Sequence, residues 1–271
     1  MRTPPVILSI AGYDPSSGAG ITADIKTAAA LGCYAVTCPT ALTVQSTQGV
    51  FQVQPVQPEI VAKTLTALTD DVELAAVRIG MLGSGEVAEA VEKFLSHQEP
   101  PNVVLDPVIR SSSGALLLDE AGLEMLRAML PFCDVITPNV EEAMLLAGLR
   151  SSFVQLANWE ATVYELRRLA DRLHELGAKA VVITGGHLDP ANDYLSDCRP
   201  GRAEEAVFPG AHIDSRSTHG TGCAFATALA CRLALGDELK QAVQAAKDYV
   251  RKAIEAAYPL GKGVGPLNHF G

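Results

Sequence analysis

Short apolar, β-type runs alternate along the chain with segments whose apolar positions recur at helical spacing, and these two patterns predict strands and helices. The predicted strands cover residues 6–11, 34–38, 75–80, 102–106, 134–137 and 180–184. The predicted helices cover residues 20–31, 59–69, 86–95, 120–129, 141–147, 159–176, 221–234 and 239–257. Alternation at this spacing indicates βαβ units, and therefore an α/β fold with a mainly parallel central sheet and helices on both faces.

The strand-like runs at 103–105 and 180–183 are apolar throughout, which is typical of strands buried on both sides. Residues 185–215 carry turn signals such as Asp189-Pro190 and Pro200-Gly201, and they predict a hairpin at the sheet edge. No polar linker, repeat or low-complexity segment divides the sequence. We therefore expect one domain over residues 1–271.

Composition narrows the classes of function. The chain is 48% hydrophobic and 19% charged, which excludes a disordered or fibrous protein. Its 21 Lys and Arg against 31 Asp and Glu give a net charge of −10, which argues against nucleic acid or an anionic membrane as partner. The longest weakly polar stretch, 221–235, is too short to span a bilayer.

The apolar run after Arg2 is ended by Gly12-Tyr13-Asp14-Pro15, so we interpret it as a first strand of a cytoplasmic protein rather than a signal peptide. Six cysteines without a C-x-x-C pair argue against a disulfide scaffold and against zinc.

Ligands of open parallel sheets bind beyond the carboxyl ends of the strands, so the loops there are the first place to look for chemistry. The loop at 12–20 is glycine-rich and opens a helix, but its spacing is not G-x-G-x-x-G. It is either a ligand loop or a flexible turn. Asp24 in the following helix either interacts favourably with the helix dipole near the N-terminus or accepts a hydrogen bond from a substrate hydroxyl.

The segment 217–224, Ser-Thr-His-Gly-Thr-Gly-Cys-Ala, directly precedes a long apolar helix. Gly220, Thr221 and Gly222 allow backbone N–H groups to converge at a helix N-terminus, which is an anion site suited to a phosphoryl group in transit. Cys223 falls in the first helical turn, where the helix field is expected to lower a thiol pKa. Cys223 is a candidate base or reactive thiol, or else a small buried residue. His219 beside it is a candidate general base or a residue that orients the backbone, and His187 is similarly ambiguous.

Two carboxylates follow other strands. Glu142 comes three residues after Asn139, which fits a simple capping box and also a position close to the same crevice. Asp106 ends a strand and is placed to hold Mg²⁺ or its water shell, because Mg²⁺ commonly takes only one or two protein carboxylates. Together with the glycine loops, these residues indicate phosphoryl transfer.

Taken in order, the motifs resemble those of bacterial hydroxymethylpyrimidine/phosphomethylpyrimidine kinases of thiamin biosynthesis, members of the ribokinase-like superfamily. The matching segments are residues 10–15, 18–21, 23–26, 40–45, 79–82, 105–108, 136–139, 185–187, 218–223 and 265–269. The resemblance covers nearly the whole chain. It implies transfer of the ATP γ-phosphoryl group to 4-amino-5-hydroxymethyl-2-methylpyrimidine and then to its monophosphate.

The resemblance also implies roles for individual residues. The pyrimidine is expected at Gly12, Asp24, Gln45, Met81 and Val108. Gly220, Thr221 and Gly222 are expected to form the anion hole, with Cys223 as the catalytic thiol. ATP and its phosphates are expected near Asn139, Thr184, Gly186, Thr218 and Lys247, with Mg²⁺ near Asp106 and Glu142. A homodimer is also implied.

Three positions depart from the pattern of that family. Thr184 and the segment 109–114, which contains Arg110, stand where lysines are common, and Val264 stands where His is frequent. Loss of a phosphate-binding lysine is expected to weaken stabilisation of the transferred phosphoryl group, and to affect the second phosphorylation most. Two other hypotheses remain: a pyridoxal or pyridoxine kinase, which shares the Gly-Thr-Gly-Cys loop, and a pyrimidine-binding regulator without turnover.

Overall fold

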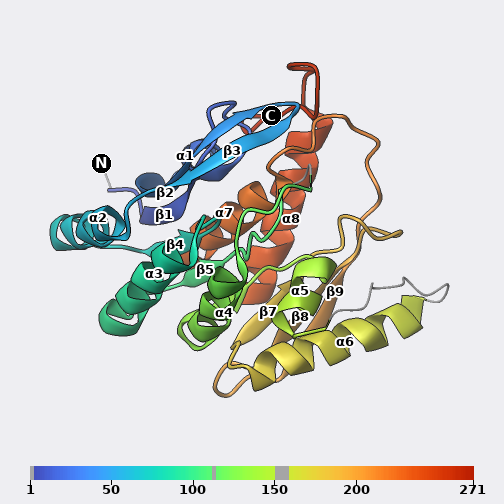
Figure 1. Cartoon of the computed structure of the whole chain (residues 1–271). Helices are drawn as coiled ribbons and strands as arrows, with labels where there is room; N and C mark the ends of the chain where they lie inside the picture. The colour runs from blue at the N-terminus through green and yellow to red at the C-terminus, as the bar shows by residue number, and fades with distance from the viewer. Residues whose placement is uncertain (1–2, 112–113, 150–158) are drawn as a thin grey trace.

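The computed structural model describes residues 3–111, 114–149 and 159–271 (Figure 1). Their strands form one sheet in the order β3-β2-β1-β4-β5-β6-β7-β8-β9. The strands are β1 (Val6–Tyr13), β2 (Tyr34–Ser46), β3 (Gly49–Pro55), β4 (Ala76–Ile79), β5 (Val103–Leu105), β6 (Val135–Ile136), β7 (Ala180–Ile183), β8 (Asp193–Asp197) and β9 (Glu204–Phe208). The central pairings from β2 to β7 are parallel, and β3, β8 and β9 pair antiparallel at the two edges.

Helices cover both faces of the sheet, as the sequence pattern predicts (Figure 1). They are α1 (Gly20–Ala30), α2 (Pro58–Asp71), α3 (Gly85–Gln98), α4 (Glu120–Met129), α5 (Val140–Leu146), α6 (Trp159–Glu175), α7 (Thr221–Ala234) and α8 (Leu239–Glu255). One core cluster joins the sheet to α2 through α6, and a second joins its other face to α1, α7 and α8. The α/β class, the mainly parallel sheet and the edge hairpin are therefore confirmed.

Sequence reasoning missed a long hairpin at the β3 edge. It predicted a strand only over 34–38, whereas β2 continues to Ser46 and turns back as β3. Pro39 interrupts the strand pattern, and Leu42, Val44 and Phe51 stay more than half exposed. The alternation of Leu42 and Val44 with Thr43 and Gln45 was a strand signal that the sequence analysis did not use.

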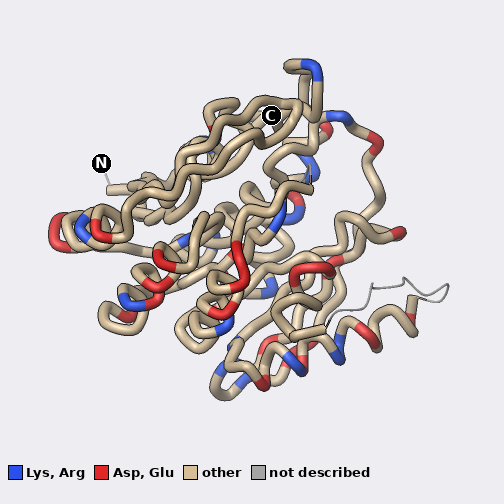
Figure 2. Tube along the Cα trace, viewed as in Figure 1, with Lys and Arg blue, Asp and Glu red and all other residues tan. Residues whose placement is uncertain are grey.

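In the view of Figure 2, Lys and Arg are dispersed among Asp and Glu over the helices rather than gathered in one basic region. No helix of the described residues is both long and apolar enough to cross a bilayer.

Candidate active site

The glycine loops after β1 and before α7 pack against each other at the carboxyl end of the sheet. Gly220 has φ of +84°, and a Cβ there would lie 1.9 Å from the carbonyl oxygen of Gly18. Gly20 has φ of +58°, and a Cβ there would lie 2.2 Å from the carbonyl oxygen of Gly12. Because only glycine fits these contacts, the sequence allows the N-termini of α1 and α7 to meet at one place. Two helix N-termini therefore lie close together, an arrangement that suits an anion.

Asp14 and His219 cross-link the two loops. Asp14 Oδ2 accepts from the backbone N–H groups of Gly18 at 3.1 Å and Ala19 at 2.9 Å, and it lies 2.8 Å from His219 Nε2. Burial acts to raise the pKa of Asp14, but hydrogen bonds from His219 and Ser16 outweigh it and lower that pKa. The structure therefore uses His219 to hold the loops together, which is the backbone-orienting alternative. His187 is exposed in the turn after β7.

Arg78 lies behind these loops and was missed by sequence reasoning. Its side chain is fully buried on β4, with Nη1 3.1 Å from Asp24 Oδ2 and Nη2 2.6 Å from Asp106 Oδ2. The sequence pattern assigns residues 75–80 to a strand and gives Arg78 no role. Gly80 leaves room for the guanidinium, because a Cβ there would lie 2.1 Å from Arg78 Nη1. One cation thus joins two of the predicted site residues.

Asp24, an expected substrate contact, is surrounded by protein groups in this structure. Asp24 is 0% exposed, and its carboxylate accepts from Ser9 Oγ at 2.6 Å and Thr227 Oγ1 at 2.7 Å as well as from Arg78. It lies in the second turn of α1 rather than at the helix N-terminus, so the interpretation that it interacts with the helix dipole is wrong. Burial raises its pKa, and Arg78 opposes that rise. Asp24 forms part of the wall behind the site.

Cys223 lies where predicted, in the first turn of α7, but its pKa moves in the other direction. Burial and the carboxylates of Asp106 and Asp24 raise the pKa of the Cys223 thiol to about 11, while Arg78 and the Gly20 N–H act to lower it. Sequence reasoning considered the helix field alone and could not see two carboxylates behind the thiol. A thiol with this pKa is neutral at pH 7.

This raised pKa predicts slow alkylation of Cys223 near neutral pH. Because the thiolate is the nucleophile, the iodoacetamide rate should rise about tenfold per pH unit until the pH approaches the thiol pKa. The rate is measured by peptide mass spectrometry from pH 6.5 to 10 on a Cys198→Ser background, which removes the exposed cysteine. A rate that levels off by pH 8 would show that the helix field dominates instead.

Several residues expected to contact the pyrimidine surround one place. A Cβ at Gly12 would lie 2.9 Å from Met81 Sδ, and Thr40 Oγ1 donates to the Met81 carbonyl at 2.5 Å. Gln45 contacts the loop that precedes α7, because its Nε2 lies 3.1 Å from His219 Nε2. Val108 comes shortly after β5, and Met81 comes shortly after the neighbouring strand β4. The structure thus gathers Gly12, Gln45 and Met81 beside the anion site.

The residues expected to contact nucleotide lie further along the same sheet edge. Thr184 forms a bridge with Asn139, and its N–H donates to the Pro138 carbonyl at 2.9 Å. Gly186 has open space around it, and Thr218 is half-buried in the loop before α7. Lys247 Nζ is paired with Asp193 Oδ2 at 2.8 Å and donates to the Ala191 carbonyl at 2.9 Å. Lys247 is therefore held by the β8 end of the sheet.

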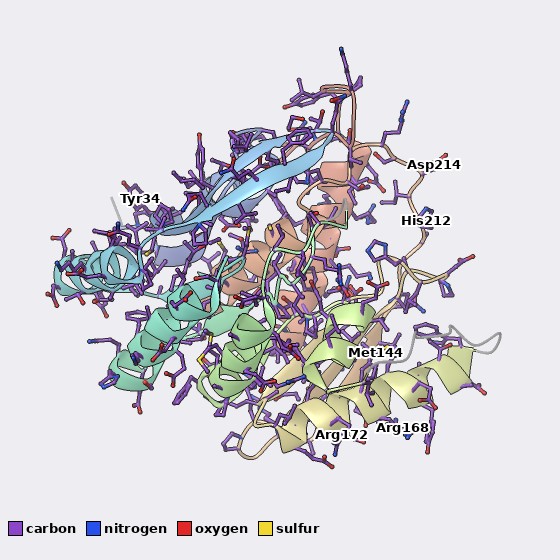
Figure 3. All side chains as sticks on the ribbon, in the orientation of Figure 1. Tyr34, Met144, Arg168, Arg172, His212 and Asp214 are labelled. Carbon is purple, nitrogen blue, oxygen red and sulfur yellow. The ribbon has the colours of Figure 1, made fainter. Side chains whose placement is uncertain are left out.

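An open cavity of about 620 Å³ lies beside this lysine, and it is lined by Asp189, Pro190, Asn192, Pro209, Gly210, Ala211 and His212. A Cβ at Gly210 would lie 2.9 Å from Lys247 Nζ. Figure 3 shows His212 and Asp214 on the loop that leads from β9 to α7. The cavity therefore borders the segment that ends in the anion loop.

Asp106 and Glu142 fit a magnesium site that uses few protein ligands. A Cβ on Gly222 would lie 3.9 Å from Asp106 Oδ1, so this carboxylate faces the start of α7. Burial, followed by the charge of Asp106, raises the pKa of Glu142 to about 8. Glu142 also completes the predicted capping box with Asn139. The described residues contain no cluster of three or more His, Cys, Asp or Glu that could hold a metal without a ligand's help.

Comparison with solved structures defines the class of protein. A pyridoxal kinase of Bacillus subtilis, solved as an ADP complex, matches with a TM-score of 0.85 and 33% identity over 98% of both chains. The fold and its two helix N-termini are thus those of a ribokinase-like kinase that transfers a phosphoryl group to a small molecule.

The chain belongs to the phosphomethylpyrimidine kinase family, whose model matches residues 14–268. It is 41% identical to a hydroxymethylpyrimidine/phosphomethylpyrimidine kinase of Streptomyces coelicolor, over 98% of this chain and 95% of that one. It is also 41% identical to a thiamine biosynthesis bifunctional protein of Geobacter sulfurreducens, over 97% of this chain but only 52% of that longer protein. The family and phosphotransferase class expected from the motifs are therefore confirmed.

Proposed function

We propose that this chain transfers the γ-phosphoryl group of ATP to the hydroxymethyl oxygen of 4-amino-5-hydroxymethyl-2-methylpyrimidine, and then to the phosphate of the monophosphate formed. The observation that carries the proposal is the meeting of the α1 and α7 N-termini beside Gln45 and Met81. The helix N–H groups stabilise the charge that develops on the transferred group. Gln45 offers both a donor and an acceptor to an aminopyrimidine edge.

In the first step the substrate hydroxyl attacks the γ-phosphorus, ADP leaves and the hydroxyl proton is released. Gly220, Thr221 and Gly222 would hold the equatorial oxygens, and Cys223 beside them would accept that proton as the thiolate, after its own proton has passed to solvent. Mg²⁺, when bound by Asp106, Glu142 and the phosphates, supplies charge neutralisation of the leaving group. The nucleotide would extend past Asn139, Thr184, Gly186 and Thr218 towards Lys247 and the cavity of about 620 Å³.

The experiment that tests the proposal offers the purified full chain ATP and Mg²⁺ with the hydroxymethylpyrimidine, its monophosphate or pyridoxal, each alone, with products resolved by mass. Turnover of both pyrimidines supports the proposal. Turnover of the alcohol alone shows that Thr184 and the absence of a lysine in the 109–114 loop have removed the second step. No pyrimidine product refutes the proposal.

Pyridoxal phosphorylation is the second candidate function, because the matching Bacillus subtilis structure is a pyridoxal kinase. The assay with pyridoxal as the substrate tests this second function. A pyridoxal kcat/KM above that of the pyrimidine would reverse the order of the two functions.

We also propose a cytoplasmic homodimer in which residues 1–271 act as one domain. The continuous sheet through the described residues supports one domain. The β2–β3 hairpin supports the dimer, because Leu42, Val44 and Phe51 are 53%, 57% and 67% exposed. Thr43 and Gln45 alternate with Leu42 and Val44 along β2, so the strand turns polar groups to the site and apolar groups away from it.

The hairpin predicts the assembly state of a double variant. Val44→Ser with Phe51→Ser should shift the protein from dimer to monomer, because the change removes exposed apolar area. Sedimentation velocity at micromolar concentration measures the shift, with the exposed Leu235→Ser at the end of α7 as the control. A monomeric unmodified protein would contradict the proposed dimer.

A further inference from the structure

Arg78 is the buried cation of this site, and the reaction described above assigns it no role. Its side chain is fully buried, and it bridges Asp24 and Asp106 through separate guanidinium nitrogens. Among the described residues, its Nε has no hydrogen-bond partner, although the atom is buried. The guanidinium therefore forms ion pairs with both carboxylates, while its Nε–H group has no hydrogen-bond partner. A buried group left in that state calls for a functional explanation.

Stability alone does not explain this arrangement. Ion pairs withdrawn from water gain little over apolar residues of the same volume, because desolvation offsets the attraction. Val77 and Ile79 pack into the core on the other face of β4, and Ala76 is buried on the same face as Arg78, so an apolar residue at 78 would continue the pattern of the strand. Arg78 also requires glycine at position 80, because any side chain there would clash with the guanidinium.

The position of Arg78 relates it to the anion loop. Asp106 Oδ2 is held by Arg78, which leaves Asp106 Oδ1 facing Gly222 at the start of α7. Asp24, on the other side of the guanidinium, is fixed by Ser9 and Thr227, so the cation itself is anchored to α1 and α7. The fork of an arginine holds two carboxylates in fixed directions, which a lysine ammonium does not.

We propose that Arg78 is a positioning residue for phosphoryl transfer, which orients the Asp106 carboxylate towards the metal and phosphates at the start of α7. This inference rests on the proposed function, since it takes Asp106 as a ligand of the Mg²⁺ that accompanies ATP. Arg78 itself is too deeply buried to contact either substrate. It acts through Asp106 and is not a catalytic residue.

Arg78→Lys keeps the charge and removes the fork, and it is the first test. Loss of a residue that orients a metal ligand typically costs about 10- to 100-fold in metal affinity or activity, so both should fall by that factor. Metal affinity is read without turnover, by electron paramagnetic resonance of Mn²⁺ titrated into protein saturated with the ATP analogue AMP-PCP. Pyrimidine affinity, measured by calorimetry, should stay within about twofold because Arg78 does not contact that site.

The matched control is Arg199→Lys. Arg199 also binds a carboxylate through two nitrogens, Asp197 at 2.9 and 2.7 Å, but at the opposite end of the sheet, where Asp197 pairs with the start of β7. Its substitution should leave Mn²⁺ affinity and kcat unchanged. If Arg78→Lys does not fold, as judged by circular dichroism, the double variant Arg78→Met with Asp24→Asn removes one charge of each sign and is measured in its place.

A folded variant with Mn²⁺ affinity and kcat within twofold of the unmodified protein would overturn the proposal. Failure of both variants to fold would also overturn it, because Arg78 would then be structural only. An unmodified protein that binds Mn²⁺ with AMP-PCP but phosphorylates no pyrimidine would refute the proposed function while the metal readout still tests Arg78.

Discussion

Replacing Cys223 by alanine is expected to lower kcat for the hydroxymethylpyrimidine by about 10²- to 10⁴-fold, the range that a positioned general base contributes. The thiol lies in the first turn of α7, beside the Gly20 N–H and next to the three residues of the proposed anion hole. Its pKa of about 11 leaves the thiol neutral at pH 7, so it must first lose its own proton to solvent before the thiolate can accept the proton of the substrate hydroxyl. Pyrimidine affinity should change little, because Gln45 and Met81 are untouched.

The measurement is kcat and KM by steady-state assay, with pyrimidine affinity by calorimetry. Cys231→Ala is the control, because Cys231 is a fully buried cysteine two turns further along the same helix and does not reach the loop. Equal losses of turnover and pyrimidine binding in Cys223→Ala would remove Cys223 from the proposed role. Cys223→Ser separates proton transfer from loop shape, since it keeps a small polar group with a higher pKa.

Gly220→Ala is expected to lower kcat by about 10²- to 10³-fold, the cost of removing a donor from an oxyanion hole. The backbone of Gly220 has φ of +84°, and an added Cβ would lie 1.9 Å from the Gly18 carbonyl oxygen. Since backbone rather than a flexible side chain stands in the way, the α7 loop must move away from the α1 loop. The N–H groups then no longer converge on the phosphoryl group.

Gly236→Ala is the matched control for this change. Gly236 also has a positive φ, +95°, but nothing lies within 4 Å of an added Cβ. It should carry the conformational cost of about 1 kcal/mol for alanine at such a position, seen as a lower melting temperature, with kcat unchanged. If Gly220→Ala shows only the same shift in melting temperature with normal kcat, the loop is not the anion hole.

The hydrophobic pattern of the sequence predicted the parallel sheet and its helices because buried strands and amphipathic helices carry that pattern locally. It also identified the loops after β1, β5, β6 and β7, since every parallel strand ends at the same edge. The prediction missed residues 39–55 because Pro39 interrupts the strand pattern, and because Leu42, Val44 and Phe51 remain exposed rather than facing the core.

The amino-acid sequence by itself determined the fold class, the family, and the glycine loop at 220–222, because these depend on residue types at fixed spacing. Only the tertiary structure decided what surrounds each charge. Asp24 proved to be a buried partner of Arg78, and two carboxylates raised the pKa of Cys223 against the helix field. Electrostatic interactions act through space between α1, β4, β5 and α7, and these elements are far apart in the chain, so no local pattern records their contacts.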